Sequence, residues 1–296
     1  MRKPAFRERP EHFTINPNSE GGWIVRGGNA ALLGLANHIT RNSSGVPLFH
    51  DSSRDHLGGQ GANHGTLTNF ASPFSSTSGP VWDATLRRWA WAFDGSNDLV
   101  NVPAAASLNP SSAISLSIWA YTNSVTGTGT MLHKGNTTAA NPYYQWALLR
   151  TSSDIYFELQ LDGVWTEKLA ASIFNIGEWT HLLCCYNGAT YQIFRNGISA
   201  AGPTALTGSI TACDTSVGIG KATSGFTNYN YWNGMLADPL VFGADMRAYT
   251  SYLANPAWSI DYGGLIQPVR TLWPGWSGGA PAGNRRRRVL ITASVA

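Results

Sequence analysis

Apolar and polar side chains alternate with a period of two residues in short stretches along most of the chain. Residues 113–121 are the clearest case, because Ile114, Leu116 and Ile118 fall on one face of an extended strand. Similar stretches lie at 89–103, 143–150, 154–161, 178–185, 190–195, 215–220 and 234–243. Turn residues separate them, and no amphipathic helix interrupts the series. The pattern predicts an all-β fold, a β-sandwich or jelly roll.

Asn-Gly pairs mark two of the predicted turns. Asn187-Gly188 joins the stretches 178–185 and 190–195, and a type I′ hairpin turn suits this pair because both of its central residues need positive φ. A second pair follows at Asn196-Gly197.

Composition agrees with an all-β fold. Charged residues make up 12% of the chain, against about 25% in an average soluble domain, and glycine is abundant with 32 residues. These values argue against a helical bundle, a coiled coil or a charge-rich disordered protein. No apolar run is long enough to cross a membrane. The three cysteines do not form a disulfide framework, and we expect buried free thiols, with a Cys213 bridge to Cys184 or Cys185 as the alternative.

The two ends of the chain differ from its centre. Residues 1–30 are polar and weakly patterned, whereas 259–296 are rich in proline, glycine and arginine, so we predict two arms around a sandwich at 31–258. The net charge of +3 divides into +2 for residues 1–12, +5 for 262–296 and −4 between them. We expect the arms to be ordered against a partner surface, in a homo-oligomer or on other proteins. The basic start lacks an apolar segment, which argues against an ordinary secretory signal.

Six short motifs occur in one order between residues 31 and 255. They are Asp51-Ser52-Ser53 with Asn63-His64-Gly65-Thr66-Leu67, Phe93-Asp94-Gly95 with Asp98-Leu99-Val100, Ser107-Leu108-Asn109 with Ser117-Ile118-Trp119-Ala120, Glu178-Trp179-Thr180-His181 with Tyr186-Asn187-Gly188 and Arg195-Asn196-Gly197, Trp232-Asn233-Gly234, and Leu236-Ala237-Asp238. This order resembles a laminin-G-like domain of the concanavalin A-like lectin/glucanase superfamily. The resemblance implies a concanavalin A-like jelly-roll β-sandwich.

The arms carry a second resemblance, to laminin-G-like proteins encoded by bacteriophages. Ile15-Asn16-Pro17-Asn18-Ser19 precedes the sandwich, and an arginine-rich stretch with a short strand follows it. The resemblance implies a non-enzymatic virion surface protein, a capsid decoration or fibre-like protein made in the cytoplasm, with a lectin-like sandwich. The alternatives are a cellular carbohydrate-binding module or adhesin, extracellular or at the cell surface, and a glycoside hydrolase.

Catalytic signatures are missing from the sequence. Glycoside hydrolysis needs two carboxylates at a defined separation. The chain has six glutamates, three of them in the N-terminal arm, and it lacks the Glu-x-Asp-x-x-Glu strand of laminarinase-type enzymes. Nucleophile-elbow, zinc-protease and phosphate-loop motifs are also missing. We therefore expect no enzyme activity, although an unrecognised carboxylate pair stays open.

A structural Ca²⁺ is the one cofactor that the resemblance implies. The matching positions are Asp94 and Asp238, with Asp51 as a further ligand, because Ca²⁺ prefers carboxylate and carbonyl oxygens on turns. Ala237 replaces one acid of the usual pair. The alternative is that these aspartates only cap turns.

Aromatic residues in polar loops are candidates for stacking on sugar rings. One group is Phe226, Tyr229, Tyr231 and Trp232, and a second is Tyr143, Tyr144 and Trp146. Packing in the core is the alternative, and for Trp146 and Trp232 we weigh it heavily. Arg285, Arg286, Arg287 and Arg288 are the candidate assembly residues. They suit an acidic neighbouring subunit better than nucleic acid phosphates.

Overall fold

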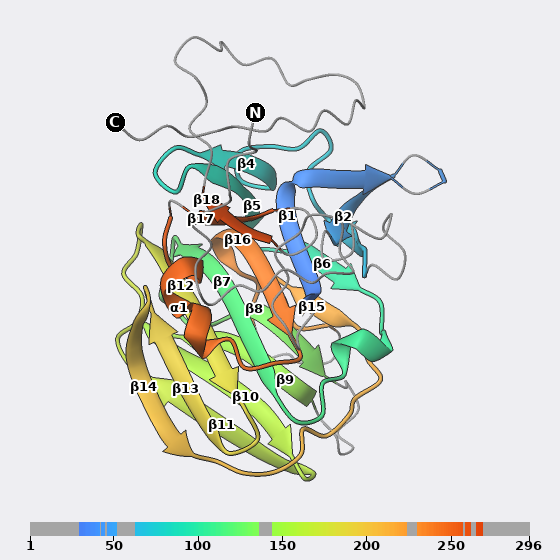
Figure 1. The fold of residues 1–296 in the computed structure, drawn as a ribbon. Helices are drawn as coiled ribbons and strands as arrows, with labels where there is room; N and C mark the ends of the chain where they lie inside the picture. The colour runs from blue at the N-terminus through green and yellow to red at the C-terminus, as the bar shows by residue number, and fades with distance from the viewer. Residues whose placement is uncertain are drawn as a thin grey trace, which may run out of the picture.

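The computed structural model describes residues 30–41, 43–44, 46–51, 63–135, 144–223, 230–256, 258–261 and 265–268. Almost all of the two predicted arms lies outside these residues. Strands dominate, as the alternation predicts, and they form two antiparallel sheets packed as a sandwich (Figure 1). Within the described residues no helix is both long enough and apolar enough to cross a membrane.

The first sheet, which we call the β7 sheet, has a strand order that departs from the order of the chain. Its strands are, in spatial order, β4 (Gly79–Asp83), β5 (Arg88–Asp94), β16 (Asn233–Phe242), β7 (Ile114–Thr122), β12 (Trp179–Tyr186), β13 (Thr190–Arg195) and β14 (Ile198–Ala205). In the centre of this sheet, β16 from late in the chain therefore lies between β5 and β7 from its first half.

The second sheet, the β8 sheet, packs behind the first. Its strands are β2 (Pro47–Asp51), β3 (Gly65–Thr68), β6 (Leu99–Val102), β15 (Val217–Ile219), β8 (Thr128–Gly135), β9 (Tyr144–Thr151), β10 (Asp154–Leu161) and β11 (Val164–Ala170). The remaining elements are short: η2 (Ala106–Leu108), η3 (Arg247–Tyr249), α1 (Thr250–Leu253) and a separate pair, β17 (Trp258–Asp261) with β18 (Leu265–Pro268).

β1 (Ala30–Arg41) belongs to both sheets. Its first residues pair with the end of β16, and from Gly34 onward it pairs with β2. The strand thus closes one side of the sandwich.

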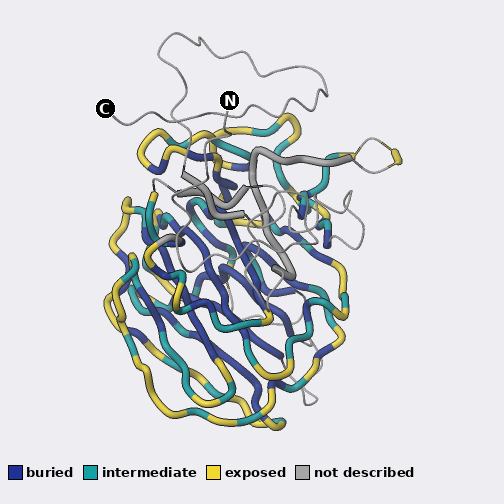
Figure 2. Tube along the Cα trace, in the orientation of Figure 1, coloured by how far each residue is buried: buried dark blue, intermediate teal, exposed yellow. Residues whose placement is uncertain are grey.

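The core lies between the sheets, where each strand contributes every second side chain. Leu116 and Ile118 of β7 face Trp146, Leu148 and Phe157 of β9 and β10 in one continuous buried cluster. Figure 2 shows this burial along the central strands of both sheets. As expected, Cys184, Cys185 and Cys213 are buried thiols that form no disulfide within the described residues.

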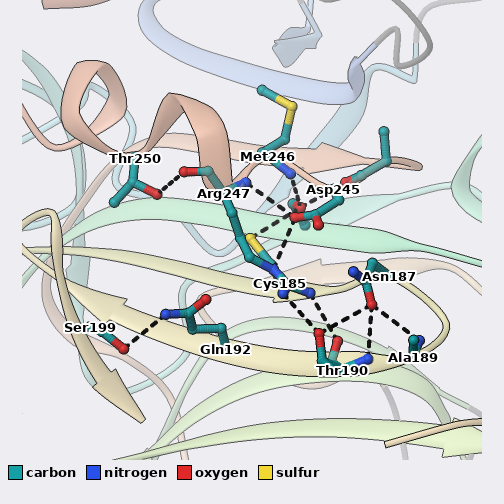
Figure 3. A network of polar contacts seen from close by, with 12 residues as sticks. Cys185, Asn187, Ala189, Thr190, Gln192, Ser199, Asp245, Met246, Arg247 and Thr250 are labelled. Carbon is teal, nitrogen blue, oxygen red and sulfur yellow. Dashed lines mark hydrogen bonds and ion pairs between the residues drawn. The ribbon is translucent and has the colours of Figure 1, made fainter. Parts of the chain in front are cut away.

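The chain between β16 and α1 covers part of the outer face of the β7 sheet (Figure 1). Ser115 Oγ donates to Ala244 O at 2.7 Å and accepts from Met246 N at 3.0 Å. The Arg247 guanidinium donates to Thr190 Oγ1 at 2.8 Å and to Thr190 O at 3.0 Å (Figure 3). We call residues 244–250 the covering segment.

The predicted turn at Asn187-Gly188 differs from the observed one. Tyr186 pairs with Tyr191, so four residues lie between them, and Asn187 has no positive φ. Its side chain instead accepts hydrogen bonds from Ala189 N and Thr190 N, which stabilises a longer loop. Asn196-Gly197 has φ values of 49° and 82°, which fit a type I′ turn.

Candidate functional site

A row of side chains crosses the outer face of the β8 sheet in strand register. Gly218 of β15 is paired with Asn101 on one side and with His133 on the other. His133 pairs with Ala147, and Ala147 pairs with Glu158. Their neighbours along each strand point into the core, so this row points outward. We call Asn101, Gly218, His133, Ala147, Glu158 and Glu167 the outer row.

The turn after β15 lies over this row. A Cβ on Gly218 would come within 2.0 Å of Lys221 O, so only glycine allows the turn to fold so closely onto the strand. Trp232 N donates to Gly220 O at 2.7 Å, which places Tyr231 beside the same turn. Lys221 Nζ lies 4.9 Å from the centroid of the Tyr231 ring.

Burial and charge set the protonation of this site. Burial, with a smaller contribution from the charge of Lys221, lowers the pKa of His133 to about 3. At neutral pH the imidazole is therefore uncharged and offers one donor and one acceptor. Burial also lowers the pKa of Lys221. Asn101 Oδ1 is buried and accepts no hydrogen bond from the described part of the chain.

Two carboxyl groups meet at the far end of the outer row. Glu158 is buried and directly opposite Glu167, whose side chain is exposed. Burial raises the pKa of Glu167, and a hydrogen bond with Glu158 opposes this effect. Such a bond between two carboxyls requires a proton on one of them.

The predicted aromatic ligands have different positions. Tyr231 is half-buried beside the outer row, whereas Trp232 is fully buried, with its ring centroid 5.9 Å from that of Phe174. Trp146 is likewise in the core, so both tryptophans have the packing role that was the alternative. For Tyr144 the structure describes only a place at the start of β9. Phe226, Tyr229 and Tyr143 lie outside the described residues.

The three predicted calcium ligands lie apart. Asp94 caps its own turn, where Oδ1 accepts from Ser96 N at 2.8 Å, and Asp51 Oδ2 accepts from Asn63 N at 2.7 Å. Asp238 forms a buried ion pair with Arg88, five residues along β16 from the partner of Asp94. Within the described residues no three His, Cys, Asp or Glu side chains gather closely enough to hold a metal ion. A bound Ca²⁺ stays a prediction.

The other predicted site lies outside the structure's described part. Arg285, Arg286, Arg287 and Arg288, the predicted assembly residues, fall within residues 269–296. Assembly through the arms therefore stays a prediction.

The two packed antiparallel sheets form a β-sandwich of the lectin-like kind. Residues 94–248, just over half of the chain, match the model of a family described as the concanavalin A-like lectin/glucanases superfamily. The chain belongs to this superfamily, as its motifs predict. No curated protein sequence matches it significantly.

Solved structures with this fold share little sequence with the chain. Domain 4 of AbnA, a GH43 extracellular arabinanase from Geobacillus stearothermophilus solved with arabinotriose, has a TM-score of 0.53 and 15% identity, covering 77% of this chain and 99% of that domain. The binding domain of Paraclostridial Mosquitocidal Protein 1 has a TM-score of 0.52 and 12% identity, covering 80% and 55%. Trypanosoma rangeli sialidase has a TM-score of 0.50 and 10% identity, covering 76% and 33%. The chain thus spans all of the arabinanase domain but only part of the other two proteins.

Proposed function

We propose that this chain is a non-enzymatic carbohydrate-binding module that binds its ligand at the turn after β15 and at Tyr231, beside the outer row. The observation that carries the proposal is the half-buried pair formed by Lys221 and Tyr231 beside the outer row. An aromatic ring can stack on the C–H face of a sugar, and neutral donors and acceptors suit sugar hydroxyls. The superfamily and the arabinotriose complex of the arabinanase domain support the same ligand class.

The carboxyl pair supports the non-enzymatic part of this proposal. Glu158 and Glu167 are directly opposite one another on neighbouring strands, and Glu158 is buried, so only one carboxyl of the pair is accessible to a glycosidic bond.

A virion surface role is the second part of the proposal, and it rests on the sequence of the arms. In this role the arms would attach the sandwich to other copies or to other virion proteins. Light scattering on the full-length chain tests it. A defined oligomer that dissociates when Arg285–Arg288 are replaced by glutamine supports assembly through the C-terminal arm. A monomer in both cases argues for a free-standing cellular module or adhesin.

Binding is tested first on a glycan array and then by calorimetry with the best oligosaccharide. We expect Tyr231→Ala and Lys221→Gln each to weaken binding about tenfold, or by ~1.4 kcal/mol. Trp82→Ala is the matched control, because this exposed aromatic residue lies on β4 of the other sheet. The same titrations with a chelator test the predicted Ca²⁺. A chain that binds no glycan, or binds equally after both substitutions, contradicts the proposal, and release of sugar lost in Glu158→Gln contradicts its non-enzymatic part.

A further inference from the structure

Two glycines fix the conformation of the turn after β15. A Cβ on Gly218 would lie 2.0 Å from Lys221 O. One on Gly220, whose φ is 81°, would lie 2.2 Å from the buried ring of Phe93. A side chain at either position would therefore displace backbone or core atoms. Lys221, the next residue of the chain, is consequently attached to a backbone that has little freedom to move.

Hydrogen bonds hold the same turn from two sides. Gly220 N donates to Met131 O of β8 at 3.1 Å, and Gly220 O accepts from Trp232 N at 2.7 Å. Asn230 N donates to Thr128 O at 2.8 Å, so the stretch 230–232 is attached to β8 as well. These backbone bonds set the position of Tyr231 relative to the turn. Because this backbone is fixed before a ligand arrives, binding has to order few groups.

Lys221 and Tyr231 form a half-buried surface that is both cationic and aromatic. Lys221 Nζ lies 4.9 Å from the centroid of the Tyr231 ring, within the range of a cation–π contact. Burial lowers the pKa of Lys221, because water hydrates its ammonium group less completely than it hydrates one at an open surface. A charge in such a place attracts an anion more strongly than a fully hydrated surface lysine does, since the effective dielectric constant is lower.

We propose that the ligand of this site is an acidic oligosaccharide, whose anionic group binds the Lys221 ammonium while one of its sugar rings stacks on Tyr231. This inference rests on the proposed carbohydrate binding and adds the class of sugar. The hydroxyls of a neutral sugar replace the water around the ammonium only in part. A negative group also compensates its charge, so the half-buried position of Lys221 favours the acidic ligand.

A lysine selects the charge of the anionic group rather than its shape. Its ammonium is a compact point charge with three rotatable donors, and it lacks the planar fork with which arginine matches a carboxylate. We therefore expect the site to accept a carboxylate, as in a uronic acid, and a sulfate ester. The experiment includes sugars of both kinds, each beside a neutral counterpart.

A second lysine–tyrosine contact in the chain provides a matched control. Lys168 Nζ lies 5.3 Å from the centroid of the Tyr191 ring. These residues belong to β11 and β13, which are strands of different sheets, and Tyr191 packs against the core. This contact has the same charge and the same kind of ring as the proposed site, but the glycine-fixed turn is not part of it. Lys168→Gln should therefore leave ligand binding unchanged.

The experiment begins with the full-length chain on an array that pairs each acidic oligosaccharide with a neutral form of the same backbone. Oligouronates are paired with their methyl esters, and sulfated galactan oligosaccharides with their desulfated forms. Calorimetry then measures both members of the best pair. We expect the acidic member to bind about tenfold more tightly. Lys221→Arg should keep this preference, as should Lys168→Gln, whereas Lys221→Gln should lose it while keeping the circular dichroism spectrum of wild type.

Each other result contradicts a defined part of the argument. Equal affinity of wild type for acidic and neutral members overturns the acidic ligand and leaves carbohydrate binding in place. A preference that survives in Lys221→Gln, or that falls equally in Lys168→Gln, overturns the assignment to this site. If no member of any pair binds, the proposed function itself fails, and the inference fails with it. A preference confined to uronates or to sulfated sugars supports the inference and identifies the anionic group.

Discussion

Tyr231 and Trp232 are neighbours in the sequence with different environments. The Trp232 ring is fully buried, with Phe174 on one side and the Arg150 guanidinium 5.7 Å from its centroid. Tyr231 is half-buried and has the Lys221 amine near its ring. One aromatic loop therefore supplies both a core residue and a candidate ligand residue.

Substitutions can distinguish the core role of Trp232 from the ligand-binding role of Tyr231. Trp232→Ala should lower the free energy of unfolding by about 3–5 kcal/mol, because it opens a large cavity in the core. Tyr231→Ala should cost less than about 1 kcal/mol in stability and still weaken glycan binding. Urea unfolding of both variants, with glycan titration of the folded Tyr231→Ala protein, checks this. A loss of stability as large in Tyr231→Ala as in Trp232→Ala would contradict it.

Two buried histidines make stability depend on pH. Burial, reinforced by the charge of Arg88, lowers the pKa of His181 to about 3, and His133 has the same value. The unfolded chain binds a proton at each near pH 6.5, so their stabilisation is complete above that pH and is lost as the pH falls toward 3. Between pH 7 and pH 5 each should cost roughly 2 kcal/mol.

His181→Gln tests this linkage. Its glutamine cannot take up a proton, so its stability should fall by about 2 kcal/mol less than that of wild type over the same pH range. Denaturant unfolding at pH 7 and pH 5 measures the difference. The same fall in both proteins would show that other groups determine the pH dependence.

The aromatic loop could be chosen as a candidate from the sequence, whereas the outer row could not. Tyr231 stands out because it lies in a polar, asparagine-bearing stretch, whereas His133 and Glu158 each lie within a largely buried strand. Which side chains these residues meet depends on which strands are neighbours, and a single sequence does not show how its strands pair. Asp238 shows the same limit, because its partner Arg88 is 150 residues away in the chain.

At the scale of elements, the covering segment connects the end of β16 to the β12–β13 hairpin through hydrogen bonds. Arg247 contacts both the side chain and the backbone of Thr190 and forms an ion pair with Asp245 (Figure 3). Ser115 joins the same segment to β7. These contacts stabilise the two short helices η3 and α1, which together span only residues 247–253.

Arg247→Ala should release this segment. We expect a loss of about 1–3 kcal/mol in stability, because the hydrogen bonds involve a charged donor that is partly buried. Amide hydrogen exchange should become faster in residues 244–256 and not in β9 or β10. Arg87→Ala, at an exposed turn position, is the control and should change neither. Unchanged exchange in Arg247→Ala would contradict this role.

Strands with clear alternation were predicted, and those without it were not. β7 and β12 lie within one residue of their predicted bounds. β8, buried along nearly its whole length, and β14, exposed along nearly its whole length, have no alternation for the pattern to detect. β11 shows the same limit, because a strand lies at the edge of a sheet through its position in the fold, and its own sequence does not show that position.

At the scale of the whole molecule, the two sheets share one core and one strand. The buried cluster includes residues of both sheets, and β1 pairs with β16 and with β2. We therefore expect a single cooperative unfolding transition. Far-UV circular dichroism and tryptophan fluorescence should give the same midpoint in urea. Two separated midpoints would show that the sheets unfold independently.

The position of β16 has a consequence for synthesis on the ribosome. β5 ends at Asp94, yet β16, which lies between it and β7, begins at Asn233. At ~5–20 residues per second, the intervening ~140 residues take roughly 7–28 s to emerge. During that time Trp91 and Phe93 of β5 have no completed core to enter. The nascent chain should therefore depend on holding chaperones until its last core strand leaves the exit tunnel.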